Sequence, residues 1–384
     1  MTRLLFVISN FEYGGAQRQV VELANHLDPG RFEAHVCSLS SYAPLATSLR
    51  DASSRLHVIP KLARFDVTVV PRLVALLRRL QIDIVQSYLF DADIAARLAG
   101  RLALTRAVVG TERNTDYTLR RRHLIAYRLT HRQVDVIIAN SHAGAAFSSR
   151  VLGHPPSFYR VVHNGVDLER FAPGPAAEVR EELGIAADEP VVGMFASFKA
   201  QKNHPLALQA ARLLLDRLPR ARFLFVGDML FEGMHGSADY ARRMHRLVDE
   251  LGIRPRCLFL GNRLDVARLY RACDVTILPS LFEGTPNVLL ESMATAVPVV
   301  ATSVADNAFI VPHGKVGFLI RPGDAAALAE RLYRLLLDHP LRLDLGQAAR
   351  AWVTEGFSTA ALAHRMAQIY DELLARPSSA RSAA

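Results

Sequence analysis

The sequence predicts an α/β protein made of two Rossmann-like, doubly wound domains that face a central cleft. Its 384 residues exceed the usual size of a domain with one core. Short apolar runs alternate with helical patterns along the whole chain, which is typical of parallel sheets covered by helices on both faces. The runs form two sets of six, separated by a Pro/Gly-rich stretch at residues 171–175, and this favours two domains over one barrel.

The first domain is expected over residues 1–170 and the second over residues 176–356, before a Pro/Ser/Ala tail at 376–384 that we expect to be disordered. Strands are predicted in the first domain at 4–8, 34–39, 82–86, 107–110, 134–139 and 159–162, with helices such as 16–27, 69–80 and 94–102. Strands are predicted in the second at 191–195, 222–226, 257–260, 275–278, 299–301 and 317–320. A ligand is expected at the carboxyl ends of these strands.

The composition predicts a cytoplasmic protein that is soluble or peripheral to a membrane. Cys37, Cys257 and Cys273 lie far apart in the sequence, so we expect them to be small buried apolar residues. Unpaired cysteines are typical of a reducing compartment. The first apolar run is too short for a signal peptide, and no stretch reaches the roughly 18 apolar residues of a spanning helix.

Residues 1–170 hold 22 Lys and Arg against 14 Asp and Glu, so they carry most of the net charge of +9. Nucleic acid, anionic lipid and phosphorylated substrates are therefore all candidate partners.

A glycine pair, Gly14 and Gly15, lies between the first strand and its helix. Glycines at such a turn let backbone N–H groups approach an anion at the helix N-terminus. The alternative is a tight turn without a ligand. The pair is not a G-x-G-x-x-G motif, and no acidic residue ends the second strand, so a dinucleotide fingerprint is not supported.

Two lysines, Lys199 and Lys202, follow the first strand of the second domain in a chain that otherwise prefers arginine. Point charges beside a helix start suit a diphosphate. The alternative is a solvated pair before a helix capped by Asn203.

The segment 278–292 carries the strongest signal. Thr285 is a natural N-cap and Pro286 a natural first helical residue, so the loop 284–287 would present free N–H groups to a phosphate leaving group. Glu283 precedes the helix, and Glu291 lies about one and a half turns inside it. The alternative makes Glu283 a complement to the helix dipole and Glu291 a surface charge. However, the neighbours of Glu291 are apolar, where a carboxylate needs a partner.

With these segments in view, the chain resembles the retaining glycosyltransferases of family 4 (group 1), which have the glycosyltransferase-B fold. Glu283 and Glu291 match the E-x7-E signature. Further matches are residues 140–141, 161–167, 197–203, 263–265, 274–280, 298–302 and 317–319. The helix at 357–375 resembles the one that crosses back onto the first domain in this family.

The resemblance implies roles for single residues. Glu291 would bind the ribose hydroxyls, Glu283 the donor sugar, and Lys202 and Gly15 the diphosphate. Arg263 would lie near the base. The implied donor-binding set is Gly14, Gly15, Ser197, Lys199, Lys202, Arg263, Gly284, Thr285, Pro286, Asn287, Val288 and Glu291. Such enzymes need neither a bound metal nor a cofactor, and the leaving diphosphate is stabilised by cations and amides.

The chain departs from the family pattern at several positions. Ser197 stands where an arginine is frequent, and Lys199 would compensate. A histidine common in the first domain is missing, so Arg113 or Asn114 would serve, and Arg113 joins Glu283 and Lys202 as a catalytic candidate. The usual glycine pair after the strand at 299–301 reads Ala305 and Asp306, and a frequent glutamate is Phe309.

Three other interpretations remain open. Asp91 and Asp93 form a D-x-D, which holds a divalent ion in transferases of the other main fold, although capping of the helix at 94–102 is favoured. The lost glycines and histidine leave room for a catalytically inactive binding or scaffold protein. A sugar-nucleotide epimerase has a similar two-domain fold.

The stretch 119–132 contains five arginines, no acid and interspersed apolar residues. It is either a basic amphipathic helix that lies on anionic lipid or a domain helix with a solvated basic face. Nucleic acid is disfavoured because no binding module or aromatic platform is recognised. We expect a transferase that moves a hexose or N-acetylhexosamine from a nucleotide sugar to a glycan or lipid-linked acceptor.

Overall fold

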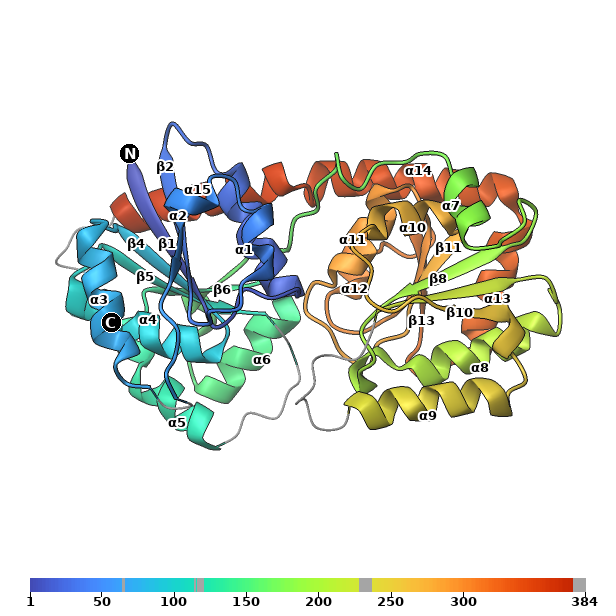
Figure 1. The fold of residues 1–384 in the computed structure, drawn as a ribbon, viewed down its shortest axis with the longest axis horizontal. Coiled ribbons are helices and arrows are strands. Elements are labelled where there is room, and N and C mark those ends of the chain that lie inside the picture. Colours follow the sequence, from blue (N-terminus) through green and yellow to red (C-terminus); the bar gives the residue numbers. More distant parts are fainter. Residues whose placement is uncertain (64–65, 114, 116–120, 228–236, 376–384) are drawn as a thin grey trace. The chain divides into compact units, whose positions relative to one another are not determined.

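The computed structural model of the protein describes all residues except 64–65, 114, 116–120, 228–236 and 376–384 (Figure 1). The chain divides into two compact units. Unit 1 contains Met1–Gly165 and Thr359–Ala384, and unit 2 contains Val166–Ser358. The predicted tail at 376–384 and the candidate Asn114 lie outside the described residues.

Unit 1 is built on a seven-stranded parallel sheet with the order β3-β2-β1-β4-β5-β6-β7. Its strands are β1 (Thr2–Ile8), β2 (Phe32–Ser38), β3 (Leu56–Val58), β4 (Ile84–Tyr88), β5 (Ala107–Glu112), β6 (Val136–Ala139) and β7 (Tyr159–Val161). Its helices are α1 (Gly15–His26), α2 (Ala52–Arg55), α3 (Val69–Arg79), α4 (Phe90–Ala103), α5 (Arg121–Leu129), α6 (His142–Leu152) and α15 (Thr359–Ala375). One apolar core joins the sheet to α1 and α15, and a second joins it to α3 and α4.

Unit 2 is built on a six-stranded parallel sheet with the order β10-β9-β8-β11-β12-β13. Its strands are β8 (Val191–Phe195), β9 (Arg222–Val226), β10 (Cys257–Phe259), β11 (Val275–Leu278), β12 (Val299–Thr302) and β13 (Gly317–Ile320). Its helices are α7 (Ala177–Glu182), α8 (His204–Leu215), α9 (Ser237–Glu250), α10 (Val266–Ala272), α11 (Asn287–Ala294), α12 (Asn307–Ile310), α13 (Ala325–Leu337) and α14 (His339–Gly356). Helices α8, α9 and α13 share one core, while α10, α11 and α14 share the other.

Both sheets reverse their strand order at one point, as doubly wound sheets do. The reversal lies between β1 and β4 in unit 1 and between β8 and β11 in unit 2. The predicted class, two α/β units with parallel sheets covered on both faces, is therefore confirmed. Among the described residues, no helix is long and apolar enough to cross a membrane.

The structure adds a strand that the sequence prediction missed. β3 is three residues long, partly exposed and at the sheet edge, so it lacks the buried apolar run that marked the other strands. The last helix, α15, belongs to unit 1, where Leu362, Met366 and Tyr370 are buried in the core. The hydroxyl of Tyr370 donates a buried hydrogen bond of 2.5 Å to Oε1 of Gln86 on β4.

Candidate functional site

The loops that carry the predicted donor site flank the reversal point of the unit 2 sheet. Lys199 and Lys202 follow β8, and Glu283 follows β11, the strand paired with β8. All six strands of this sheet are parallel, so these loops lie at one edge. Ligands of doubly wound proteins bind at the carboxyl ends of the strands beside such a reversal.

Lys202 and Glu283 are paired directly. The Nζ of Lys202 lies 2.5 Å from Oε1 of Glu283, and both side chains are largely buried. Gln201 connects the two loops through two hydrogen bonds. Its carbonyl oxygen accepts one from the N–H of Leu281 at 2.8 Å, and its Nε2 donates the other to the carbonyl of Phe282 at 2.8 Å. The sequence placed the lysine and the glutamate in one site, whereas the role of Gln201 needed the tertiary structure.

Lys199 is the second cation of this edge. Burial lowers the pKa of its ammonium group, the neighbouring charge of Lys202 lowers it further, and Glu283 opposes both effects. A partly desolvated ammonium group interacts with an anion more strongly than a solvated one does. The alternative of a solvated lysine pair is therefore wrong for these two residues, since both side chains are at least half-buried.

Glu291 is buried on α11 and has a defined partner. The hydroxyl of Tyr270, on α10, donates a hydrogen bond of 2.9 Å to Oε2 of Glu291. The Tyr270 ring is itself fully buried and stacks on Phe195 at 3.7 Å between centroids. Glu291 is 6% exposed, so the alternative that it is a surface charge is wrong. Tyr270 was missed because nothing local in the sequence links residues 21 apart.

The start of α11 differs from the prediction by one residue. Pro286 occupies the N-cap position with φ −76° and ψ 114°, which is extended rather than helical, and Asn287 is the first helical residue. Thr285 is therefore outside the helix and does not cap it. Gly284 and Val288 flank this turn as expected, and the helix start still faces the carboxyl edge because α11 follows β11.

Arg263, in the loop after β10, is held by two acids. Its guanidinium forms two hydrogen bonds of 2.7 Å with Asp265 and one of 3.1 Å with Glu182, and these bonds raise the pKa of Arg263. Ser197 lies at the start of the loop after β8. Gly227, with φ +134°, approaches this loop so closely that a Cβ there would lie 2.3 Å from the carbonyl oxygen of Ala196.

His204 begins α8 and is a buried histidine that the sequence analysis did not single out. Burial, together with the charge of Lys202, lowers the pKa of His204 to about 3. Its ring stacks on Phe198 at 4.4 Å, and its backbone N–H donates to the hydroxyl of Tyr240 at 3.1 Å. The preceding Asn203 occupies the N-cap position with φ 53°, but its side chain makes no capping hydrogen bond, so that part of the prediction is wrong.

In unit 1, the predicted residues lie at the carboxyl edge of the sheet. Gly14 is the N-cap residue of α1 and Gly15 its first residue, and a Cβ at position 14 would lie 2.3 Å from Oε1 of Gln17. Arg113 follows β5, with its guanidinium 5.4 Å from the centre of the Tyr88 ring. Burial is the main cause that lowers the pKa of Arg113.

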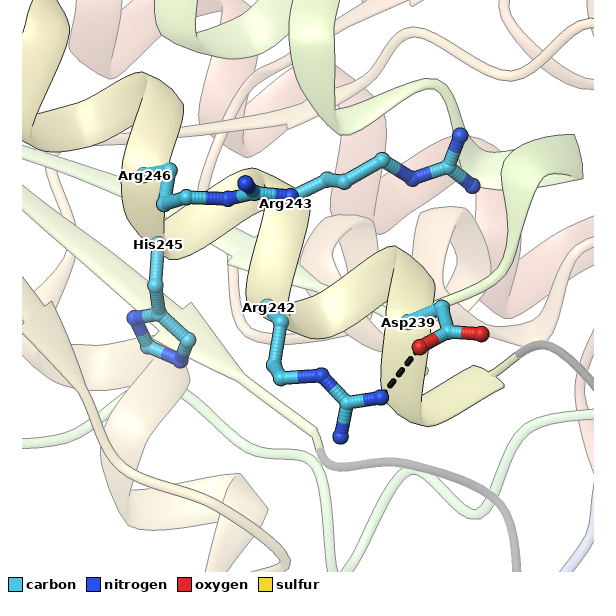
Figure 2. Close-up of a pocket in the computed structure, with 5 residues that line it drawn as sticks. All are labelled: Asp239, Arg242, Arg243, His245 and Arg246. Carbon is cyan, nitrogen blue, oxygen red and sulfur yellow. Dashed lines mark hydrogen bonds and ion pairs between the residues drawn. The ribbon is translucent and has the colours of Figure 1, made fainter.

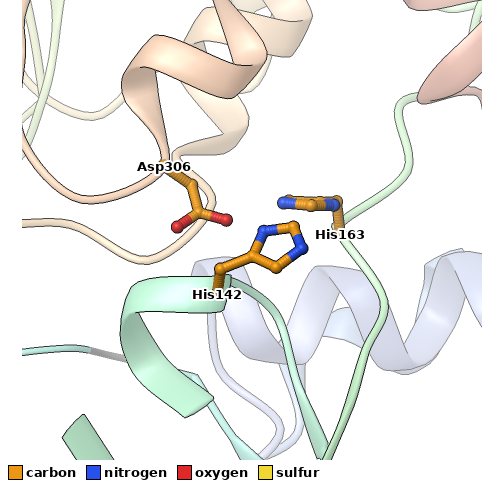
Figure 3. A group of neighbouring side chains, drawn as sticks. All are labelled: His142, His163 and Asp306. Atoms are coloured by element: carbon orange, nitrogen blue, oxygen red, sulfur yellow. The ribbon is translucent and has the colours of Figure 1, made fainter. Parts of the chain in front are cut away.

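Two histidines also lie at this edge of unit 1. His142 is the first residue of α6, after β6, and the buried His163 follows β7. Their ring centroids are 5.3 Å apart, and Figure 3 shows the two imidazoles next to each other. No local signal in the sequence links this pair, because the two residues are 21 positions apart and the strands that precede them are neighbours only in the folded sheet.

Asp91 and Asp93 are both engaged by cations in unit 1. Helix α4 begins at Phe90, with Leu89 at its N-cap position, so neither aspartate caps it as predicted. Instead they lie in the first turn, where Asp91 pairs with Lys61 at 2.5 Å and the buried Asp93 pairs with Arg97 at 2.8 Å. Acids in the first turn complement the positive helix end.

Family models match both units of the chain. Residues 13–170 match the family described as Glycosyltransferase Family 4, and residues 176–352 match the family described as Glycosyl transferases group 1. The UDP-Gal:alpha-D-GlcNAc-diphosphoundecaprenol alpha-1,3-galactosyltransferase of Escherichia coli is 26% identical over 377 residues, 94% of each chain. The N-acetyl-alpha-D-glucosaminyl L-malate synthase of Bacillus anthracis is 27% identical over 317 residues, 81% of this chain and 80% of that one.

A solved structure extends the likeness of the fold. Anabaena HepE in complex with UDP and glucose superimposes with a TM-score of 0.85 over 97% of this chain and 100% of that one, at 24% sequence identity. The parallel sheets, the paired family matches and this likeness agree on a glycosyltransferase-B fold. The chain belongs to the group 1 glycosyltransferases.

Proposed function

We propose that the enzyme transfers a hexose or N-acetylhexosamine from a nucleoside diphosphate sugar to a glycan or lipid-linked acceptor, in the synthesis of a cell-surface polysaccharide or glycolipid. The E. coli relative is named for a UDP-sugar donor and a diphosphoundecaprenol-linked acceptor, and HepE was solved with UDP and glucose. These names favour uridine as the first base to test.

The pairing of Lys202 with Glu283 carries this proposal. It places a cation and a carboxylate together at the reversal point of the unit 2 sheet. In the donor complex, Lys202 and Lys199 face the diphosphate, together with the backbone from Gly284 to Val288. Glu283 then accepts hydrogen bonds from hydroxyl groups of the sugar. Glu291, oriented by Tyr270, accepts hydrogen bonds from the ribose hydroxyl groups. Ser197 and Arg263 border the nucleotide. In unit 1, Gly14 and Gly15 leave the start of α1 open to an anion.

The reaction that fits these groups is transfer with retention. The bond between the anomeric carbon and the β-phosphate oxygen breaks, and a bond to the acceptor oxygen forms on the same face. The acceptor proton passes to the leaving phosphate oxygen, so no protein base is consumed. Lys202 and the amides stabilise the negative charge that develops on the diphosphate. This chemistry differs from that of glycosidases, in which paired carboxylates act as acid and base or nucleophile.

We further propose that transfer needs no bound metal and no cofactor. Lys199 and Lys202 supply positive charge where a divalent ion would otherwise screen the diphosphate. Asp91 and Asp93, the residues of the D-x-D, are paired with Lys61 and Arg97. Transfer that persists unchanged in excess chelator is the expected result, and a loss restored by Mg²⁺ or Mn²⁺ would contradict it.

The acceptor is proposed to bind at the carboxyl edge of unit 1, with Arg113 in the place of the histidine frequent in this family. His142 and His163 lie at the same edge and are further candidates for contact with acceptor hydroxyls. The enzyme is proposed to work in the cytoplasm, peripherally on the inner face of a membrane, without nucleic acid. Three buried, unpaired cysteines and the basic character of residues 1–170 support this location.

Calorimetry of the purified protein against UDP-, GDP- and ADP-sugars is the first test, followed by transfer assays on single variants. Glu291→Ala should weaken nucleotide binding, and Glu283→Ala should mainly lower turnover. Glu330→Ala, an exposed carboxylate on α13, is the matched control and should change neither. Near-normal binding and turnover in both site variants would contradict the site, while an absence of any turnover in the native protein would favour an inactive binding protein.

A further inference from the structure

Helix α5 differs from the other helices of unit 1 that are longer than one turn, because each of those buries several residues. None of its residues is buried, although its nine residues include Leu124, Ile125 and Leu129. Ile125 is 57% exposed and Leu129 is 75% exposed, and they are four residues apart, hence on one side of the helix. Two large apolar side chains on one exposed turn are unusual without a partner surface.

The exposed apolar pair is surrounded by arginines. Arg121, Arg122 and Arg128 on α5, and Arg132 just after it, are all exposed. Among the residues that the structure describes, Arg121, Arg128 and Arg132 form no ion pair with an acid. Apolar side chains flanked by unneutralised cations are typical of helices that lie in the plane of an anionic bilayer surface.

The contacts of α5 with the rest of unit 1 leave the side with Ile125 and Leu129 exposed. The helix is held from the opposite side by aromatic contacts, with the Phe90 ring 4.1 Å from His123 and 5.3 Å from Tyr127, measured between centroids. The guanidinium of Arg97 lies 5.0 Å from the centre of the Tyr127 ring. His123 and Tyr127 therefore contribute to the packing of α5, while Ile125 and Leu129 stay mostly exposed.

A second exposed apolar stretch adjoins the same first turn of α4. Lys61 pairs with Asp91, which is next to Phe90, and it precedes Leu62, which is 78% exposed. Val67, farther along the same connection to α3, is 80% exposed. Leu62 and Val67 are thus two further large apolar side chains of unit 1 that the described residues leave largely exposed.

Helix α9 in unit 2 also carries several arginines, but its described residues lack the exposed apolar side chains that accompany the arginines on α5. Figure 2 shows Arg242, Arg243, His245 and Arg246 around a shallow hollow on α9. Arg242 pairs with Asp239 there, and the same helix ends in Asp249 and Glu250. No large apolar side chain of α9 is strongly exposed among its described residues. α9 is a solvated charged helix and a suitable control.

From these observations we propose that α5, with Ile125 and Leu129 inserted and Arg121, Arg128 and Arg132 over the headgroups, docks unit 1 on an anionic lipid bilayer. The role of this docking rests on the proposed function. If the acceptor is lipid-linked, docking through unit 1 would bring the acceptor-binding unit to the membrane. The binding itself requires no sugar donor and is measured separately.

Co-sedimentation of the full chain with vesicles tests the surface. We expect binding to phosphatidylcholine vesicles that contain phosphatidylglycerol and none to pure phosphatidylcholine. Removing two charges in Arg128→Gln/Arg132→Gln should lower partitioning about 30-fold, from the usual contribution of a basic residue near an anionic surface. Removing the apolar pair in Ile125→Ser/Leu129→Ser should lower it about tenfold or more.

Two control variants test whether the location of the substituted residues on α5 matters. Arg243→Gln/Arg246→Gln removes two exposed arginines from α9, and Leu102→Ser/Leu104→Ser removes two exposed leucines at the end of α4. Both controls should stay within about twofold of the native protein, as exposed substitutions usually do. Because all eight positions are exposed, thermal unfolding should be near native in each variant.

Three results would overturn the proposal: no binding to the anionic vesicles, equal losses in the controls, or an apolar variant that binds like the native protein. The last result would mean general attraction to polyanions, including nucleic acid, rather than insertion into a bilayer. Nucleotide-sugar calorimetry on the same variants separates this proposal from the proposed function. Vesicle binding without any turnover contradicts only the function, and turnover without vesicle binding contradicts only the docking surface.

Discussion

Replacing Tyr270 with phenylalanine removes one hydroxyl group and leaves the ring in place. The hydroxyl donates the 2.9 Å hydrogen bond to Glu291, while the ring keeps its stacking on Phe195 and its edge contact with Phe171 at 5.9 Å. A hydrogen bond to a charged group contributes about 1.5–3 kcal/mol. Without it, Glu291 is held less firmly before the nucleotide binds, so we expect UDP affinity to fall about tenfold, or about 1.4 kcal/mol.

A double comparison tests whether this loss acts through the ribose. Calorimetry would measure UDP and 2′,3′-dideoxy-UDP with the native protein and with Tyr270→Phe. The native protein should prefer UDP, and the variant should lose most of that preference, because the two changes remove parts of the same interaction. Tyr240→Phe, which removes another largely buried hydroxyl of unit 2, should leave the preference intact. Equal weakening of both ligands by Tyr270→Phe would refute the reasoning, since the hydroxyl would then act only on stability.

Three further predictions concern the same unit. Lys202→Met should abolish most transfer and destabilise the fold by about 3 kcal/mol, because Glu283 loses its buried partner; Lys202→Met/Glu283→Gln should recover stability in urea unfolding but not transfer. The folded pKa of His204, about 3, lies below its ordinary value of 6.5, so its contribution to stability is complete above pH 6.5 and is lost as the pH falls towards 3, by roughly 1.4 kcal/mol per pH unit. His204→Gln should flatten that slope in urea titrations at several pH values, and an unchanged slope would contradict burial as its cause. Gly227→Ala should cost about 2 kcal/mol or more of unfolding free energy because of its backbone clash, whereas Gly184→Ala, also at positive φ but with open space, should cost about 1 kcal/mol.

The positions of most strands along the chain, and of the donor loops, could be predicted because each depends on local sequence. An apolar run marks a buried parallel strand, and the loop after it is at the carboxyl edge wherever the strand lies in the sheet. Lys202 and Glu283 were therefore assigned to one site although 81 residues separate them. The edge strand β3 was missed because it is short and half-exposed, and so it carries no such run.

Other parts of the site depend on tertiary geometry that has no local signal. The phrase 263–265 contains an arginine and an aspartate, but only the structure shows that Asp265 and Glu182 hold the guanidinium of Arg263 from two sides. The partnership of Tyr270 with Glu291 likewise requires α10 to pack beside α11. The helix start at Asn287 was displaced by one residue because Pro286 takes an extended ψ that its ring permits as readily as the helical one.

The division of the chain into units also sets an order for its biogenesis. Residues 166–358 form unit 2, and the backbone N–H of Val166 donates to the carbonyl of Phe357 at 2.8 Å, so the points where the chain enters and leaves this unit are joined. Unit 2 is therefore a closed insertion that a ribosome finishes before α15 has emerged. Until then, the core of unit 1 lacks Leu362, Met366 and Tyr370, and Gln86 lacks its donor. The strands of unit 1 thus wait for α15, and the nascent chain exposes apolar surface to chaperones for the whole of that interval.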